Sequence, residues 1–260
     1  MPASSASWIA FTREVSASIV DCELTHLARA PIRVDVARAQ HRGYERLLSS
    51  LGCEVRRVAP APEHADAVFI EDTAVVLNEV AVICRPGAKS RRAEVTAVAA
   101  ALTGLRQVVR VTSPATLDGG DVLVVGRTVF VGRTARTNAA GASQLADALA
   151  PFGYVVRGVP VTGCLHLKSA VTALDDATVL MNPAWVQREE FEGYRVVEVD
   201  AHEPMGANVL RLGDALVHGA AYPRTRERIV RLGFTPHTID VSELAKAEGA
   251  VTCCSVLLQP

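Results

Sequence analysis

The chain has 260 residues, 27 Lys and Arg against 28 Asp and Glu, a formal net charge of −1 and a hydrophobic content of 49%. This balance excludes a disordered chain, which would combine low hydrophobicity with high net charge, and a nucleic-acid-binding protein, which would carry a basic excess. Residues 1–15 lack the features of a signal peptide, and no apolar run is long enough to cross a bilayer. With six cysteines and no sign of export, we expect reduced thiols and a cytoplasmic location.

The predicted elements follow one another in a regular order along the chain. Near the N-terminus, strands at 8–11 and 55–58 flank a helix over 34–51. Four further segments each predict two short strands, a helix and a third strand. The strands are expected at 74–77, 80–84 and 107–111, then at 122–125, 129–131 and 154–156, at 171–174, 178–181 and 195–199, and at 209–212, 215–218 and 235–240. The helices are expected near 92–102, 138–150, 183–192 and 224–232, and a last strand at 256–258.

A polar group opens each of these units, which indicates an internal repeat. Asp72, Asp118, His166, Asn208 and Cys253 follow one another at intervals of 46, 48, 42 and 45 residues. A unit of this length with three strands and a helix is typical of a propeller blade with an outer helix. The N-terminal strands can complete the fifth unit, which closes a ring and removes an exposed sheet edge. We therefore predict one α/β domain over 1–260, with blades that start near 66, 116, 164, 206 and 250.

In such a ring the opening residues face one central channel. Cys253, His166 and Asp118 would then converge as a nucleophile, a base and an orienting carboxylate. Each also has a plain structural interpretation, because Asp118 lies in a turn-like Asp-Gly-Gly-Asp run, and lone histidines and cysteines are common in cores. A zinc site built from Cys164, His166 and the Cys253–Cys254 pair lacks the usual ligand spacing. We therefore expect no physiological metal, and only adventitious zinc at Cys253 and His166.

The acidic residues of the channel indicate the charge of the substrate. Asp66, Glu71 and Asp72, together with Asp118, would surround the Cys253 thiol and raise its pKa. That environment suits a cationic guanidinium, which carboxylates bind bidentately and which needs a strong sulfur nucleophile. Our hypothesis is that the bound cation helps to form the thiolate that attacks it.

Two arginines have a spacing that places them near the same site. Arg91 follows Asp72 by 19 residues, and Arg136 follows Asp118 by 18. The carboxylate of an amino-acid substrate would need such a partner. The alternative is that both are ordinary members of an arginine-rich surface.

Several motifs together resemble the dimethylarginine dimethylaminohydrolases of the guanidino-group-modifying enzymes. The segments that carry the resemblance are 34–39 (VDVARA), 66–72 (DAVFIED), 85–88 (RPGA) with 90–92 (SRR), 116–123 (TLDGGDVL), 136–138 (RTN), 165–169 (LHLKS) and 252–257 (TCCSVL). The resemblance implies a five-bladed α/β propeller, the pentein fold. It also implies a cofactor-independent hydrolase that converts Nω-methylated arginines into citrulline and dimethylamine or methylamine.

The resemblance also implies roles for individual residues. Cys253 would attack the guanidinium carbon and form a covalent S-alkylthiouronium intermediate. His166 would protonate the departing amine and then activate water, and Asp118 would complete the triad. Contacts with the substrate are implied for Leu24 in a lid loop, for Asp66, Glu71, Asp72, Arg91 and Arg136, and for Ala247, where the family has a larger apolar residue.

Two alternatives differ from this interpretation in chemistry or in class. The first is an arginine deiminase-like enzyme or another guanidino-group hydrolase, although deiminases usually carry an additional helical domain. The second is a non-catalytic propeller that binds a partner, which would have no use for Cys, His and Asp at equivalent blade positions. Under the main interpretation the partner is a small guanidino amino acid, neither nucleic acid nor membrane is bound, and the enzyme is a monomer or a homodimer.

Overall fold

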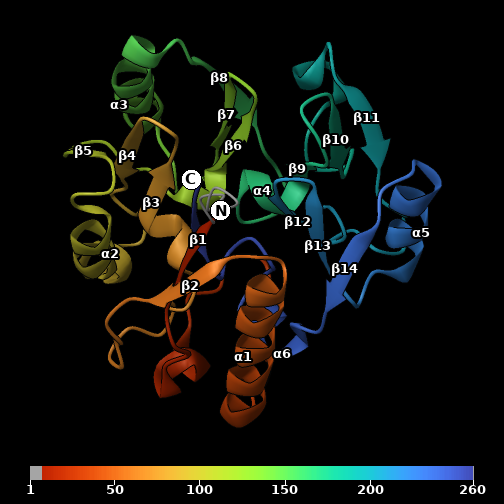
Figure 1. The fold of residues 1–260 in the computed structure, drawn as a ribbon, viewed down its shortest axis with the longest axis horizontal. Coiled ribbons are helices and arrows are strands. Elements are labelled where there is room, and N and C mark those ends of the chain that lie inside the picture. Colours follow the sequence, from red (N-terminus) through yellow and green to blue (C-terminus); the bar gives the residue numbers. More distant parts are fainter. Residues whose placement is uncertain (1–7, 260) are drawn as a thin grey trace, which may run out of the picture.

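A computed structural model describes residues 8–259 of the chain. Its strands form five sheets of three strands each. They are β15–β1–β2 (Val256–Leu258, Ile9–Thr12, Glu54–Arg57), β3–β4–β5 (Ala74–Val76, Val80–Ile83, Gln107–Arg110), β6–β7–β8 (Val122–Val125, Thr128–Arg133, Val155–Pro160), β9–β10–β11 (Val171–Ala173, Thr178–Met181, Arg195–Glu198) and β12–β13–β14 (Val209–Leu212, Ala215–Gly219, Pro236–Ile239). The sheets surround the middle of the molecule (Figure 1).

All five sheets share one topology. The inner strand (β3, β6, β9, β12 or β15) pairs antiparallel with the middle strand, and the middle strand pairs parallel with the outer one. A parallel pair needs a crossover connection, and four sheets have a helix there: α1 (Val34–Ser50), α2 (Val95–Leu102), α3 (Ala139–Leu149) and α5 (Pro223–Arg231). Figure 1 shows these helices at the periphery. The predicted order of strands and helix in the repeat is confirmed in these units.

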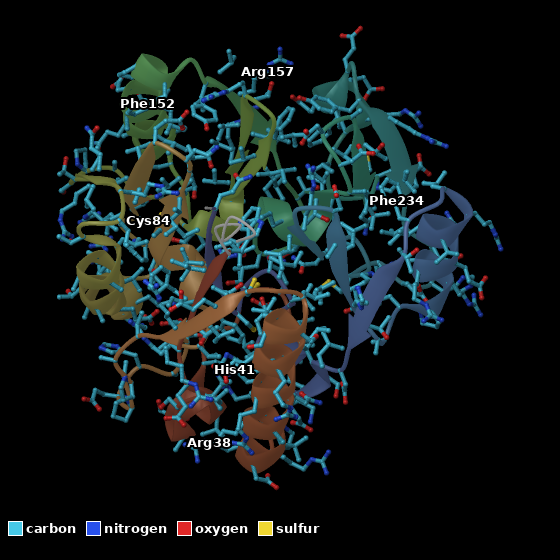
Figure 2. All side chains as sticks on the ribbon, viewed as in Figure 1. Arg38, His41, Cys84, Phe152, Arg157 and Phe234 are labelled. Atoms are coloured by element: carbon cyan, nitrogen blue, oxygen red, sulfur yellow. The ribbon has the colours of Figure 1, made fainter. Side chains whose placement is uncertain are left out.

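The core is divided into apolar clusters that lie between successive sheets. Clusters join the sheet of β3 to that of β6, the sheet of β6 to that of β9, and the sheet of β9 to that of β12. Two more join the sheet of β12 to that of β1, under α1, and the sheet of β1 to that of β3, under α2. The succession therefore returns to its starting point. Buried Cys84 lies within this packing in Figure 2, whereas exposed Arg157 points outward from the edge.

The inner strands enclose a cavity of about 540 Å³. Its lining includes residues of all five inner strands, among them Val75, Val124, Ala173, Leu210 and Leu257. Inner strands of neighbouring sheets also contact each other, as β3 does with β15 and β9 with both β6 and β12. This arrangement agrees with the predicted central channel.

One predicted helix is wrong. The segment 183–192 contains only a turn and a 3₁₀ helix, η6 (Arg188–Phe191). Asn182 Oδ1 accepts the N–H of Ala184, as an N-cap side chain does, and the N–H of Val186 donates to the Asn182 carbonyl, so one helical turn begins here. Gln187 is then extended, with φ −85° and ψ 142°, and interrupts the segment.

Short helices hold the polar residues at one end of the inner strands. They are η2 (Ile70–Thr73) before β3, η4 (Gly119–Asp121) before β6 and α4 (Leu167–Ala170) before β9. The remaining short helices are η1 (Ala17–Asp21), η3 (Lys89–Glu94), η5 (Ala150–Phe152) and α6 (Ser242–Ala245). Within residues 8–259, no helix has the length and apolar character that crossing a membrane requires.

Candidate active site

His166 and Asp118 form a buried pair near the N-terminal ends of two neighbouring inner strands, β9 and β6. Asp118 immediately precedes η4 and His166 immediately precedes α4, so both side chains project from equivalent points of their units. His166 Nε2 lies 3.1 Å from Asp118 Oδ2. The other Asp118 oxygen accepts the N–H of Gly87 at 2.8 Å, which fixes the carboxylate.

Asp72 contacts the same imidazole. It lies in η2, in the unit that precedes the unit of Asp118 along the chain. Its Oδ1 lies 3.8 Å from His166 Nδ1 and accepts the N–H of Gly120 at 2.9 Å. The close approach requires glycine at 120, because a Cβ there would lie 2.6 Å from His166 Nδ1 and 2.7 Å from Asp72 Oδ1. The Asp-Gly-Gly-Asp run is thus more than a turn: it lets two carboxylates and a histidine pack against one another.

Arg91 lies on the far side of Asp72 and is almost fully buried. Its Nη1 donates to Asp72 Oδ2 at 2.5 Å, and its Nε and Nη2 donate to the Glu94 carboxylate. Nη2 also donates to the backbone carbonyls of Asp66 and Phe69. Sequence reasoning placed Arg91 at the substrate's amino-acid end. The structure shows a guanidinium that is mostly occupied by protein acceptors and that positions Asp72.

Cys253 lies in a turn just before β15. Its Sγ accepts the N–H of Ala250 at 3.4 Å, and its carbonyl accepts the N–H of Glu71. Cys253 as a residue is partly exposed, in contrast to the five other cysteines, which are buried. The predicted nucleophile is therefore the accessible one.

A small cavity of about 20 Å³ joins Cys253 to most of the predicted substrate-binding residues. It is lined by Asp66, Asp72, Arg91, Arg136, Ala247 and Cys253, and also by Glu23, Phe69, Leu165 and Glu248. Leu24 does not line it; its side chain packs against the apolar cluster under α1. His166 and Asp118 lie behind Asp72 rather than in the lining.

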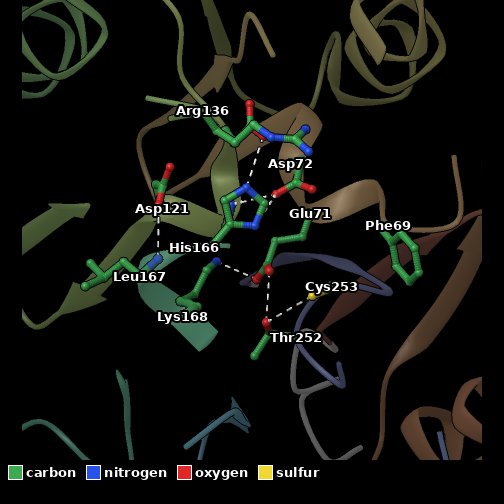
Figure 3. A network of polar contacts seen from close by, with 12 residues as sticks. Phe69, Glu71, Asp72, Asp121, Arg136, His166, Leu167, Lys168, Thr252 and Cys253 are labelled. Atoms are coloured by element: carbon green, nitrogen blue, oxygen red, sulfur yellow. Dashed lines mark hydrogen bonds and ion pairs between the residues drawn. The ribbon is translucent and has the colours of Figure 1, made fainter. Parts of the chain in front are cut away.

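Glu71 and Asn208 belong to a second network on the other side of Cys253. Thr252 Oγ1 donates to Glu71 Oε2 at 2.8 Å and accepts from Asn208 Nδ2 at 3.0 Å. Lys168 forms an ion pair with Glu71. Figure 3 shows Glu71 between Lys168 and Thr252, with Asp72 and His166 above and Cys253 beside Thr252. Glu71, Lys168 and Thr252 also line the large cavity, so this network borders it as well as the site.

The electrostatics agree with the predicted effect of the acids on the thiol. Burial, together with Glu71 and Asp72, raises the pKa of Cys253 to about 12. Burial opposes protonation of His166, but Asp72 and Asp118 outweigh it and raise the pKa of His166 to about 9. Burial likewise raises the pKa of Asp66 to about 6. Near neutral pH the site therefore combines a neutral thiol with a protonated imidazole.

The donor atoms of Asp72, Asp118 and His166 lie within 4.8 Å of one another, a spacing that could accommodate a cation. Cys253 is not a member of this group. Cys164, which the zinc alternative included, donates instead to the carbonyl of His166 at 3.4 Å. The two carboxylates also flank a histidine whose raised pKa favours its charged form.

Sequence reasoning missed several residues of the site. Glu94 holds Arg91, Thr252 joins two units, and Glu23 and Glu248 line the cavity. Thr252 could have been found as the neighbour of the predicted nucleophile. Glu23 and Glu248 gave no signal, because a loop and a turn far apart in the sequence bring them together.

Comparison with known proteins identifies the class to which this fold and site belong, the hydrolases of the arginine deiminase family. The arginine deiminase family model matches residues 63–207. A curated relative from Streptomyces coelicolor, N(G),N(G)-dimethylarginine dimethylaminohydrolase, is 43% identical over 96% of both chains. A relative of the same name from Pseudomonas aeruginosa is 34% identical over 85% of this chain and 89% of its own. The chain belongs to the dimethylarginine dimethylaminohydrolase family.

Solved structures give the same result. The dimethylarginine dimethylaminohydrolase of Pseudomonas aeruginosa, as a cysteine-to-serine variant complexed with citrulline, matches with a TM-score of 0.91, 31% identity, and coverage of 96% of this chain and 98% of the other. The N-terminal domain of the cyanobacterial arginine dihydrolase ArgZ matches with a TM-score of 0.86, over 98% of both chains, at 17% identity. This second likeness concerns the fold alone.

Proposed function

We propose that this chain hydrolyses Nω-methylated arginines to citrulline and dimethylamine or methylamine. The observation that carries the proposal is the junction of Cys253, Asp72, Arg136 and Asp66 around one cavity, with the His166–Asp118 pair behind Asp72. The names of the relatives, and the citrulline in one of the solved structures, support a guanidino amino acid as the substrate.

Cys253 serves as the nucleophile in this proposal. Its raised pKa keeps the free thiol protonated near neutral pH. A guanidinium bound by Asp72 brings a positive charge next to the sulfur, which favours the thiolate. The thiolate then attacks the guanidinium carbon, and a C–S bond forms while the proton of the thiol passes to solvent.

His166 supplies the proton for the departing amine. Its pKa of about 9 keeps the imidazole protonated in the resting enzyme. As the C–N bond breaks, the proton passes to the amine nitrogen and leaves a neutral imidazole and a Cys253 thiouronium. The neutral imidazole then takes a proton from water, whose oxygen attacks the same carbon. The C–S bond breaks with its electron pair on sulfur, the proton of the added hydroxyl passes to the thiolate, and neutral citrulline is released from the restored Cys253 thiol.

The remaining residues bind the substrate. Asp72 holds the guanidinium, and Asp66 and Arg136 hold the ammonium and the carboxylate of the amino-acid end. Arg91 and Glu71 support the site and do not bind the substrate themselves, because each forms an ion pair with another side chain of the protein. Ala247 leaves room beside the substrate, and Leu24 supports the loop over the cavity.

We also propose that residues 1–260 form one domain, a five-bladed α/β propeller. The closed succession of apolar clusters and the cavity lined by all five inner strands support this proposal. The proposed catalytic residues all come from this chain, and we propose that the enzyme is a monomer or a homodimer and that its chemistry needs no cofactor. Six free cysteines support a cytoplasmic enzyme.

A citrulline assay with asymmetric dimethylarginine, monomethylarginine and arginine, side by side, tests the function. We expect turnover of the methylated substrates and its loss in Cys253→Ser. Cys22→Ser, at a buried thiol outside the cavity, is the matched control. Turnover of arginine alone would indicate a deiminase, and no citrulline from any substrate would contradict the proposal.

A further inference from the structure

Glu248 has an uncommon backbone conformation next to the cavity. Its φ is 57°, and it is the only residue other than glycine with a positive φ in the described part of the chain. A left-handed conformation is unfavourable for a residue other than glycine, because its Cβ crowds the following carbonyl oxygen. The turn after α6 would form more easily with glycine, so the glutamate side chain needs an explanation.

The Glu248 carboxylate accepts three consecutive backbone N–H groups from a distant loop. Oε1 accepts from His26 at 2.5 Å and from Leu27 at 2.7 Å, and Oε2 accepts from Thr25 at 3.0 Å. These three loop residues are exposed, whereas Glu248 is 8% exposed. The loop between η1 and α1 is thus fastened to the body of the protein by one side chain more than 220 positions away.

The same loop contacts the residues that we assign to the substrate's amino-acid end. The N–H of Glu23 donates to Asp66 Oδ2 at 3.1 Å, and Arg136 Nη2 donates to Thr25 Oγ1 at 3.3 Å. We call residues 23–27 the covering segment. With this segment in place the cavity measures about 20 Å³, which is room for about one water molecule and far too little for an arginine. The covering segment must therefore move before a substrate can enter.

We propose that Glu248 is a positioning residue that fastens the covering segment over the cavity. It touches none of the reacting atoms and acts through the backbone of residues 25–27. When the segment closes over a bound substrate, the three hydrogen bonds hold it against Asp66 and Arg136 and complete the amino-acid end of the pocket. The enzymatic part of this inference rests on the proposed function.

Hydrogen–deuterium exchange of the whole chain tests the fastening directly. In Glu248→Gly, the carboxylate is lost while the backbone conformation becomes easier, so the variant is expected to fold. We expect the amides of residues 25–27 to exchange at least about tenfold faster, because exposed amides without a hydrogen bond are unprotected. Glu248→Gln should show a smaller increase. Glu227→Gln, at an exposed glutamate on α5, is the control and should match the wild type. Unchanged exchange in Glu248→Gly would overturn the proposal.

Steady-state kinetics with monomethylarginine test the consequence. We expect Glu248→Gly to raise KM at least tenfold and to change kcat less than threefold. A merely structural role would lower kcat through loss of folded enzyme and leave KM unchanged, and that result would overturn the proposal, as would unchanged kinetics despite faster exchange. If the wild type made no citrulline at all, the proposed function would be wrong. The exchange experiment would still test the hydrogen bonds between Glu248 and residues 25–27.

Discussion

Arg91 Nη1 donates to Asp72 Oδ2 at 2.5 Å, and both side chains are buried. The other oxygen of Asp72 faces Gly120 and His166. Asp72 thus lies between a permanent cation and the proposed catalytic histidine. The bidentate contact of Arg91 with Glu94 extends this line of alternating charges into the surrounding protein. The position of Asp72 in the site is therefore set by an arginine that sequence reasoning assigned to the substrate.

Arg91→Lys should destabilise the protein. A lysine keeps the charge but cannot reproduce the planar contacts with Glu94, Asp72 and the carbonyls of Asp66 and Phe69. We expect the free energy of unfolding in urea to fall by about 3 kcal/mol, the usual cost of disrupting a buried ion pair. Arg110→Lys, at an exposed position on β5, is the control. Equal effects of the two substitutions would show that the buried contacts of Arg91 contribute little.

Asp118→Asn should shift the pH dependence of turnover. Asp118 raises the pKa of His166, so its neutral replacement should lower that pKa from about 9. Because the protonated imidazole is the proposed acid, activity must fall as pH rises through its pKa. We expect the alkaline limb of kcat to move to lower pH by about one unit or more. Citrulline formation between pH 6 and 11 measures it, and an unmoved limb would indicate that another group sets it.

Thr252→Val should destabilise the protein by removing the side-chain hydrogen bonds beside Cys253. Valine preserves the shape but removes the hydroxyl that joins Glu71 to Asn208. Each of these buried partners loses a hydrogen bond, which costs about 1–3 kcal/mol in the free energy of unfolding. Thr128→Val on β7 is the control, because a β-branched residue fits that strand equally well. A loss of stability confined to Thr252→Val, measured in urea, would support the role of the hydroxyl, and equal values would argue against it.

The sequence predicted much of the fold because the repeat is local. Each unit has short apolar strands, and the strands at 122–125, 178–181, 209–212 and 256–258 begin and end as predicted. The helix predicted over 183–192 is wrong because the backbone becomes extended at Gln187 after a single turn. A local change of backbone conformation of this kind leaves no trace in hydrophobic periodicity.

The sequence predicted which residues converge at the site, but not all of the contacts that they make. The residues that open the units do converge, because the ring brings equivalent positions together: His166 meets Asp118 and Asp72, and Cys253 lies across the cavity. The spacing of Arg91 from Asp72 correctly indicated proximity, but not that the two side chains would pair with each other. Contacts such as that of Glu248 with Thr25 depend on how a loop folds back over the ring, and periodicity carries no information about that.

Gly120→Ala should strongly lower turnover, whereas the control Gly158→Ala should not. The added Cβ would lie 2.6 Å from His166 Nδ1 and 2.7 Å from Asp72 Oδ1, so one of these side chains must move. A displacement of about 1 Å at reacting groups typically costs about a hundredfold in rate, and we expect at least that loss in kcat. Overpacking should also lower the free energy of unfolding by about 1–3 kcal/mol.

Gly158→Ala on β8 is the control, because its Cβ meets only the Arg133 side chain, at 3.8 Å. It should retain full activity. If Gly120→Ala kept wild-type turnover, His166 and Asp72 would not need the close packing that the glycine permits. If it lost turnover and still bound citrulline with the wild-type affinity, the damage would lie in the orientation of the imidazole and not in the pocket for the amino acid.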